Sequence, residues 1–341
     1  MIPRLQISFS LKKQRAFWLG KAYSPQEGEY LLNHARSGIV MALHAALPNG
    51  GRVGVVAYNC HTVANAVVEA GGTPIFVDVT EDLHMDVLHL AGLQLDVIVV
   101  TNLFGIHNDI EAIRAAQPNA IIIVDNAHGY GLPAEGDFTV YSINQGKFPA
   151  LGEGGILVVN NELYRHPILQ QYAALPSYSK MQELKLFITM LVKAWMHIPW
   201  IYGLLTRRMK AHRGAVACRE EVMLRCMAKG VSRMYQQALP TIAEQIQQQR
   251  ANAQQIANIL ISKGFAEKVW YGENAFMLIA RTKDTMTLSK YLAAHGVESA
   301  THFARATEWA KEFGYTEGQC PVAEKLTKEL IMIPTYVRYT V

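Results

Sequence analysis

Residues 52–79 read RVGVVAYNCHTVANAVVEAGGTPIFVDV, a stretch in which a helical pattern lies between two strand-like runs. The outer runs, RVGVVA (52–57) and PIFVDV (74–79), are rich in valine and isoleucine, and TVANAVVEAG (62–71) has a helix-like pattern. Apolar runs without alternation are typical of strands that are buried on both faces. The stretch therefore predicts two parallel strands joined by a helix.

The same alternation continues along the chain to about residue 160. NDIEAIRAAQP (108–118) predicts a helix opened by an asparagine cap, and GEYLLNHARSGIVMALHAAL (28–47) predicts helical segments around Ser37 and Gly38. Strand–helix alternation of this kind predicts an α/β fold with a mainly parallel sheet and a site at the carboxyl ends of its strands. The further strand candidates are DVIVV (96–100), AIIIVD (120–125), FTVYSI (138–143) and GILVV (155–159).

The C-terminal third of the chain predicts a second, smaller α/β domain. Residues 235–263 have the pattern of a long amphipathic helix that is interrupted early by Pro240, and the strand-like run FMLIAR (276–281) follows. We expect a large domain over residues 1–234 and a small domain over residues 235–341.

Composition and charge exclude several classes of protein. Half of the 341 residues are hydrophobic and 18% are charged, so a sizeable core is available and disorder is not expected. The net charge of +4 is mild and gives no reason to expect a nucleic-acid partner. No signal peptide is recognisable, and the cysteines show no metal-ligand spacing, so we expect a reducing cytoplasmic location and no metal. The four scattered cysteines are Cys60, Cys218, Cys226 and Cys320.

One segment within an apolar insertion around residues 175–222 is unusual for a soluble domain. LKLFITMLVKAWMHIPWIYGLL (184–205) is strongly apolar and is followed by the basic run TRRMKAHR. The favoured interpretation is a core or oligomer-interface hairpin. A second interpretation is a peripheral contact of residues 184–212 with the inner face of a membrane, because aromatic and basic residues together are typical of interfacial segments. A transmembrane helix fits least, since Lys193, His197 and Pro199 interrupt the run.

The chemistry is expected around SINQGKFPALGEGG (142–155), which places Lys147 in a glycine-rich turn before an apolar strand. Such a lysine is either a solvated loop residue or a nucleophile that forms a Schiff base with a carbonyl compound. Asp125, at the end of AIIIVD, is either a turn or helix cap or the partner of a cationic ring nitrogen. Ser142 could share a ligand with Lys147, and a helix opening near Ser37 could bind a phosphate.

The order of these motifs is similar to that of a known family. The chain resembles the DegT/StrS family of pyridoxal-phosphate-dependent sugar aminotransferases, which have the aspartate aminotransferase fold of type I. The resemblance covers roughly residues 28–160 and 235–336. Besides Ser37-Gly38-Ile39 and SINQGKFPALGEGG, its motifs are AYNCHTVANAVVEAGGTPIFVDV (57–79), NLFGIHNDI (102–110), VDNAHG (124–129) and CPVAEKLTKELIMIP (320–334).

The resemblance implies a role for each matching position toward pyridoxal 5'-phosphate. Lys147 would bind the cofactor covalently and move a proton, and Asp125 would pair with the ring nitrogen. His128 would lie near the 3-hydroxyl of the ring. The remaining positions implied to bind the cofactor are Ser37, Gly38 and Ile39 with Ser142 at the phosphate, and Cys60 with His61 at the ring.

The resemblance also implies an activity, with departures that leave alternatives open. The family transfers an amino group from glutamate or glutamine to a keto-sugar, most often a nucleotide-linked 3- or 4-keto-deoxysugar, for lipopolysaccharide or glycosides, and acts as a homodimer. The family's threonine, ring-stacking aromatic and partner-subunit asparagine fall at Ile39, Cys60 and Met223 here. Two alternatives are a dehydratase, against which Lys147 counts, and a non-catalytic or lipid-linked-substrate member of the fold at the membrane surface.

Overall fold

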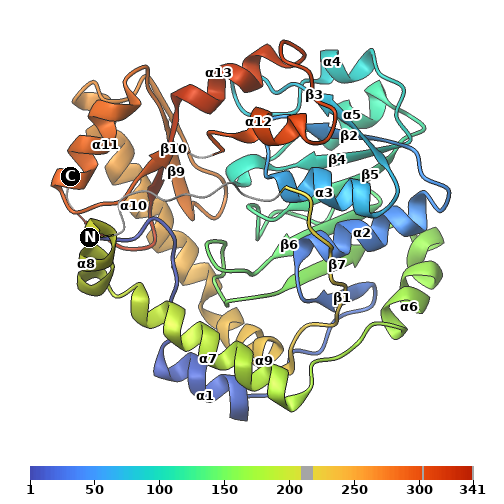
Figure 1. Ribbon diagram of the computed structural model, residues 1–341, viewed down its shortest axis with the longest axis horizontal. Coiled ribbons are helices and arrows are strands. Elements are labelled where there is room, and N and C mark those ends of the chain that lie inside the picture. The colour runs from blue at the N-terminus through green and yellow to red at the C-terminus, as the bar shows by residue number, and fades with distance from the viewer. Residues whose placement is uncertain (209–217, 302, 340–341) are drawn as a thin grey trace.

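A computed structural model describes residues 1–208, 218–301 and 303–339. Its larger sheet has seven strands in the order β1-β7-β6-β5-β4-β2-β3 (Figure 1). Pairing is parallel from β3 through β2, β4 and β5 to β6, and antiparallel where β7 joins β6 and β1 joins β7. The strands are β1 (Glu29–Leu32), β2 (Arg52–Val56), β3 (Thr73–Val77), β4 (Val97–Thr101), β5 (Ile121–Asn126), β6 (Phe138–Ser142) and β7 (Gly155–Val159).

All six strands that the sequence predicts in this region are confirmed, as is the mainly parallel α/β sheet. Strand β1 was not predicted, because its four residues lie in a stretch that has a helical pattern overall. The prediction of an asparagine cap on the helix at 108–118 is wrong. The cap is Asp109, whose carboxylate accepts the N–H of Ala112, whereas the side chain of Asn108 accepts the N–H of Met85.

The helix α2 (Ala35–Ala46) packs tightly against the middle of this sheet because two glycines allow it. A Cβ atom on Gly38 would lie 2.9 Å from the Val140 side chain, and one on Gly155 would lie 2.3 Å from the backbone of His34 and Ala35. The start of α2 is thereby held beside the carboxyl ends of β5 and β6. The other elements of this part are α1 (Leu11–Leu19), α3 (His61–Glu69), α4 (Val87–Ala91), η1 (Leu103–Gly105), α5 (Ile110–Ala116), η2 (Glu162–Tyr164) and α6 (Arg165–Ala173).

The C-terminal part contains a four-stranded sheet in the order β10-β11-β9-β8, at the upper left of Figure 1. The long helix predicted over 235–263 is confirmed with its early interruption, since η3 (Leu239–Thr241) contains Pro240. The division at residues 234 and 235 stays a prediction and falls inside α9. The elements are α9 (Lys229–Ala238), α10 (Ile242–Ser262), β8 (Lys268–Trp270), β9 (Met277–Arg281), α11 (Thr285–Ala294), β10 (Ala300–Thr301), α12 (Ala306–Lys311), α13 (Pro321–Glu329) and β11 (Leu330–Pro334).

The apolar segment forms two helices, α7 (Lys180–Met196) and α8 (Pro199–Arg208), which are bent by 81° at the break between them. Within the described residues no single helix is long and apolar enough to cross a membrane, although the bent pair has the required length and composition. Residues 209–212 of the predicted contact lie outside the described residues.

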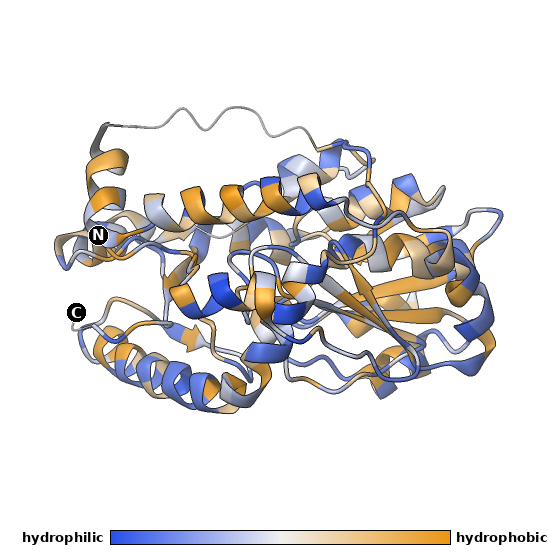
Figure 2. Cartoon of the chain, turned by 90° about the horizontal axis from the view of Figure 1, so that it is seen from below, coloured by the Kyte–Doolittle hydropathy of each residue, from blue (hydrophilic) through white to orange (hydrophobic). Residues whose placement is uncertain are grey.

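One side of α7 faces the protein, where Phe187 packs on the rings of Phe9, Phe17 and Trp18 and Met190 is buried. The other side is exposed and apolar, and Figure 2 shows apolar residues along much of this helix pair. We call the exposed apolar residues of the two helices the outer face. It consists of Met181, Leu184, Ile188, Leu191, Val192 and Trp195 on α7, Ile198 at the break, and Trp200 and Leu204 on α8.

Candidate active site

A cavity of about 190 Å³ opens at the carboxyl ends of β4, β5 and β6. We call it the active-site cavity, because it gathers most of the residues that the sequence singled out. Asp125 comes from the end of β5, Ser142 from the end of β6 and Lys147 from the loop that follows β6. Its other lining residues are His34, Ala35, Arg36, Ile39, Asn59, Cys60, Thr62, Val63, Thr101, Ala127, His128, Asn144 and Phe303.

Asp125 is a buried carboxylate with two hydrogen bonds. One oxygen accepts the N–H of Ala127 at 2.9 Å, and the other accepts the hydroxyl of Thr101 at 3.4 Å. The Thr101 oxygen in turn accepts the side-chain amide of Asn59 at 2.9 Å, which fixes the hydroxyl's orientation. Burial raises the pKa of Asp125, and these donors oppose that rise only in part. A cation placed in the cavity would offset the desolvation of the ionised carboxylate.

Lys147 lies opposite His128, and the two side chains form a hydrogen bond. The Nζ atom of Lys147 is 2.5 Å from Nε2 of His128, while Nδ1 of the same imidazole accepts the backbone N–H of Phe104 at 3.1 Å. A neutral imidazole that accepts at Nδ1 carries its hydrogen on Nε2. That hydrogen points at Nζ, so the amine must offer a lone pair. The pair therefore contains an uncharged lysine.

Burial acts in the same direction, because it lowers the pKa of Lys147, although the charges of Cys60 and Asp125 oppose this shift. An uncharged primary amine is the nucleophilic form of lysine. The loop that bears it is fixed at both ends, since Leu151 donates to Ile143 and Ile143 donates to Gly154 across its base. Lys147 is accordingly a side chain fixed at the cavity and not a solvated loop residue.

The start of α2 borders the cavity beside the loop after β6. The side chain of Asn144 lies 3.3 Å from the ring of His34, the residue that precedes the helix, and the ring gives the helix no capping hydrogen bond. The first backbone N–H groups of a helix form an anion site. Ile39 lines the cavity here, but Ser37 and Gly38 do not: the Ser37 hydroxyl donates to Asn33, and Gly38 faces the sheet.

The two residues implied to cover a cofactor ring separate in the structure. Cys60 precedes α3 and lines the cavity, with its sulfur 3.1 Å from the Thr62 hydroxyl that donates to it. The ring of His61 is not among the lining residues and makes an edge contact with Trp309 instead. A helix turn of about 100° per residue points consecutive side chains in different directions, which explains the separation.

Sequence reasoning missed several residues that shape the cavity. The rings of Phe104 and Phe303 both stack on the imidazole of His128, with centroids 5.6 Å and 6.0 Å away. Both phenylalanines have a positive φ, near +56° and +50°, a strained conformation that is enriched at functional sites. Thr101 could have been identified from its place at the end of a predicted strand. Nothing in the sequence marks Phe303, which comes from the C-terminal part of the chain.

The donor set fits the cofactor that the sequence implies. Pyridoxal phosphate needs an amine for its aldehyde, an acid for its ring nitrogen and donors for its phosphate. Lys147 supplies an uncharged amine, Asp125 supplies the buried carboxylate, and the start of α2 with Ser142 supplies donors. All of these groups line one cavity.

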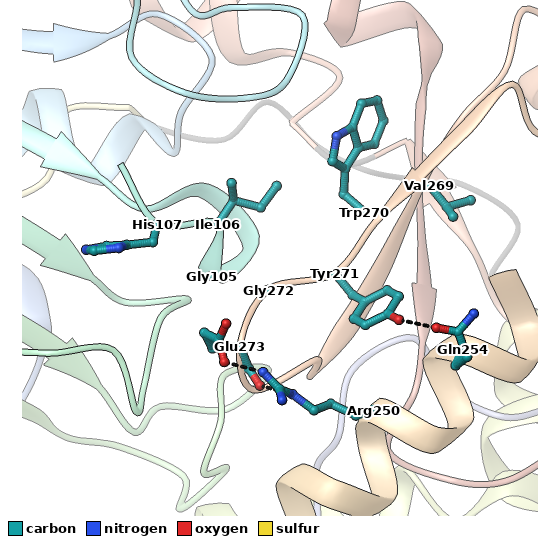
Figure 3. Close-up of a pocket in the computed structure, with 10 residues that line it drawn as sticks. All are labelled: Gly105, Ile106, His107, Arg250, Gln254, Val269, Trp270, Tyr271, Gly272 and Glu273. Carbon is teal, nitrogen blue, oxygen red and sulfur yellow. Dashed lines mark hydrogen bonds and ion pairs between the residues drawn. The ribbon is translucent and has the colours of Figure 1, made fainter. Parts of the chain in front are cut away.

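A second cavity, of about 750 Å³, lies between the loop after β4 and the C-terminal part of the chain (Figure 3). It contains the rings of Trp270 and Tyr271, but no lysine. Its polar side chains are engaged: Arg250 pairs with Glu273, His107 pairs with Glu135, and the Tyr271 hydroxyl donates to Gln254. Among the described residues, the larger cavity therefore presents no lysine and no unpaired acid, and the smaller one is the candidate active site.

Comparison with protein families and solved structures gives a consistent result. The model of the DegT/DnrJ/EryC1/StrS aminotransferase family matches residues 30–193 and 206–341. A search of curated protein sequences found no match.

Solved structures similar to this chain share its fold at low sequence identity. The sugar aminotransferase CalS13 from Micromonospora echinospora is 17% identical, with a TM-score of 0.70 over 98% of this chain and 95% of that one. The putative sugar aminotransferase Spr1654 from Streptococcus pneumoniae is 15% identical, with a TM-score of 0.72 over 98% and 94%. The GDP-4-keto-6-deoxy-D-mannose-3-dehydratase of E. coli is 16% identical, with a TM-score of 0.68 over 99% and 96%.

Proposed function

Since the chain belongs to the DegT/DnrJ/EryC1/StrS aminotransferase family, we propose that it moves an amino group from glutamate or glutamine to a keto-sugar. It is a pyridoxal-phosphate-dependent enzyme with the fold of type I, as its family is. The proposal rests on one observation above all. An uncharged lysine, a buried carboxylate and a helix N-terminus line the same cavity.

Each of three residues in the cavity would have a separate role in the proposed reaction. Bound pyridoxal phosphate supplies an electron sink for the carbon that gains or loses the amino group. Asp125 would keep a negative charge against the ring nitrogen, where burial strengthens the attraction. Lys147 would first hold the cofactor and, once displaced by substrate, would move a proton as a base and acid. His128 orients the amine through Nε2.

The finer substrate assignment is part of the proposal. Two of the solved structures with this fold are described as sugar aminotransferases, and a third is named for a GDP-linked 4-keto-6-deoxy sugar. These names support a nucleotide-linked 3- or 4-keto-deoxysugar as acceptor, and with it a role in lipopolysaccharide, capsule or glycoside synthesis. We also propose a cytoplasmic homodimer, in keeping with such a water-soluble acceptor.

The experiment that tests this function is an absorption spectrum of the purified protein with added pyridoxal phosphate. We expect a visible band that requires Lys147 and fades when glutamate or glutamine is added. In Lys147→Ala the band and the transamination rate should both be lost, because no other amine lies in the cavity among the described residues. Circular dichroism of the variant should match the unchanged protein.

Two results would contradict the proposal. A protein that gives no band, or a band that Lys147→Ala retains, would favour a non-catalytic member of the fold. Lys185→Ala is the matched control, because Lys185 is an exposed lysine on α7, and this variant should keep both the band and the rate.

A second proposal concerns where the enzyme works: we infer that the outer face contacts an anionic membrane surface. The exposed fractions of Trp195 and Trp200 are 60% and 71%, although tryptophan is a residue that proteins usually bury. A contiguous exposed apolar patch of this kind is typical of a contact site. Leu11, Trp18 and Leu19 of the neighbouring helix α1 are exposed as well.

Charge complementarity favours a membrane over a second copy of the chain as the occupant. Residues 1–25 and 176–217 together contain 12 lysines and arginines and one acid, Glu183, whereas the rest of the chain contains 20 basic and 27 acidic residues. The two segments are therefore +11 and the remainder is −7. Glu183 is buried and accepts the N–H of Lys229. Apolar and aromatic side chains within a basic region match the interface of anionic lipids.

Vesicle sedimentation tests the contact. We expect the protein to bind vesicles of phosphatidylcholine with phosphatidylglycerol, and to bind more weakly in high salt or to phosphatidylcholine alone. A double variant, Trp195→Glu with Trp200→Glu, should lose binding. The matched control is Leu163→Glu, because Leu163 is 80% exposed on η2, outside the outer face.

Two outcomes would overturn the membrane contact. The first is equal sedimentation of the double variant and the unchanged protein. The second is a pair of observations: the unchanged protein binds no vesicles, and the double variant has half of that protein's molar mass in solution. This result would assign the outer face to a second copy of the chain. If binding is found, lipid-linked keto-sugars become the acceptors to test next, as the altered-substrate alternative predicts.

A further inference from the structure

Arg36 is a cation in the active-site cavity that the roles assigned above leave unused. It is the second residue of α2, and its side chain lines the cavity close to Ile39. In the described part of the chain its guanidinium makes no hydrogen bond or ion pair. A guanidinium has five N–H donors and no acceptor. Arg36 therefore has its full donor capacity available to a ligand.

The groups around Arg36 do not neutralise it. Burial, with the nearby charge of Arg36, lowers the pKa of His34 to about 4, so the ring is neutral at physiological pH. Glu153 is the nearby acid, but its carboxylate accepts the hydroxyl of Tyr178; burial raises its pKa, and the charges of Arg225, Lys193 and Arg36 oppose that rise. Arg36 thus lines the cavity close to an acid with which it forms no ion pair.

The other groups at this end of the cavity also suit an anion. The 12-residue helix α2 begins here, its capping residue His34 makes no side-chain hydrogen bond to the helix, and the hydroxyl of Ser142 lines the same cavity. Ile39 presents only carbon atoms, and the Ser37 hydroxyl is already bonded to Asn33. A doubly charged ligand group would therefore depend on the guanidinium for most of its charge compensation.

We propose that Arg36 binds the phosphate group of the cofactor and supplies the charge that the side chains of Ser37 and Ile39 do not. The inference rests on the proposed function, since that function brings the phosphate to this cavity. A carboxylate of the amino donor has the same chemistry and is the other possible anion. The phosphate fits better, because Ser142 lies beside the start of α2 and Arg36 lines the same cavity, whereas the buried Asp125 carboxylate would repel an anion placed beside it.

The test compares pyridoxal phosphate with pyridoxal, which lacks the phosphate. Both aldehydes are titrated into the unchanged protein, Arg36→Ala, Arg36→Lys and Arg52→Ala, and dissociation constants are read from the Lys147-dependent band. We expect Arg36→Ala to weaken pyridoxal phosphate about 10- to 100-fold, as loss of a charge-assisted pair does, and to leave pyridoxal unchanged. Arg36→Lys should be intermediate, because lysine keeps the charge and loses the planar fork.

Arg52→Ala is the control, since Arg52 is exposed at the opposite, amino-terminal end of β2 and should alter neither constant. An equal loss for both aldehydes, or no loss for either, overturns the inference. If only the glutamate concentration that bleaches the band changes, Arg36 binds the donor carboxylate instead, which also overturns it. Absence of the band in the unchanged protein would refute the proposed function itself, so the two failures are distinguishable.

Discussion

The active-site cavity and the outer face depart from ordinary protein surfaces in opposite directions. In the cavity, ionisable groups are buried: Asp125 is 3% exposed, and burial shifts the pKa of both Asp125 and Lys147 toward their neutral forms. On the outer face, large apolar groups are exposed, with Trp200 at 71%. Folding gains nothing from either arrangement, because desolvated charges and solvated apolar groups are both unfavourable.

The difference indicates which kind of binding partner would balance each region. A cavity that buries an acid, an amine and a helix N-terminus is balanced by a ligand that brings opposite charges, and pyridoxal phosphate brings a ring cation and a phosphate. A face that exposes tryptophans among lysines is balanced by an apolar surface with negative headgroups. The two proposals therefore give each region its own binding partner, and each prediction below changes one region while leaving the other intact.

The largest effect is expected from Asp125→Asn. The substitution keeps the size of the side chain and removes its negative charge. Turnover should fall about 100-fold or more, because a preorganised charge in a buried site stabilises the transition state on this scale. The visible band should persist, since Lys147 is untouched. Measurement of the transamination rate beside the spectrum tests both statements.

The control is Asp137→Asn. Asp137 is also buried, and it pairs with Arg114 at the amino-terminal end of β6, away from the cavity. This variant should lose stability and keep the turnover of the folded protein within a few-fold. An Asp125→Asn enzyme that is as fast as the unchanged protein would remove Asp125 from the reaction.

The sequence predicted the sheet well because parallel strands that are buried on both faces consist of continuous apolar residues. The same logic placed Asp125 and Ser142 at strand ends, and parallel pairing then brought them into one cavity. It failed for β1, whose four residues pair with β7 from a distant part of the chain. A pattern within a few neighbouring residues cannot identify a partner strand so far away in the sequence.

Other features needed the three-dimensional structure. The direction of the His61 ring depends on where α3 begins, and the unpaired state of Arg36 depends on which acids are near it. The apolar run at residues 184–205 predicted a core or oligomer-interface hairpin, with a membrane contact as the second interpretation, and did not show which of its side chains are buried. The structure decides it through Phe9 and Phe17, which occupy one side of α7 and leave the other open.

A second prediction compares the two sides of α7 directly. Met190 is 4% exposed and packs within the inner cluster, so Met190→Ala should lower the free energy of unfolding by about 2–5 kcal/mol. Trp195, on the outer face, should cost less than about 1 kcal/mol when changed to alanine, because its side chain is largely exposed in the folded chain. Urea titrations with equal slopes would measure both values. A large loss for Trp195→Ala would mean that the outer face is covered in solution, and the contrast between the two regions would disappear.

The smallest effect concerns Cys60, the one thiol among the cavity-lining residues. Burial alone would raise the pKa of this thiol, but hydrogen bonding from His61 and from the hydroxyl and backbone of Thr62 outweighs it and lowers the pKa to about 7. Because the thiolate is the reactive form, alkylation by iodoacetamide should accelerate as the pH rises toward 7 and level off above it. Thr62→Val should move the midpoint to higher pH.

Mass spectrometry can follow each cysteine separately, which supplies the control within one chain. Cys218 is buried and its pKa is raised, so it should react more slowly than Cys60 and only at higher pH. Pyridoxal phosphate should slow alkylation of Cys60 and leave Cys218 unchanged, because only Cys60 lines the active-site cavity. A Cys60 midpoint near that of an ordinary thiol, with no protection by the cofactor, would show that the cavity does not activate this group and that its unusual electrostatics are confined to Lys147 and Asp125.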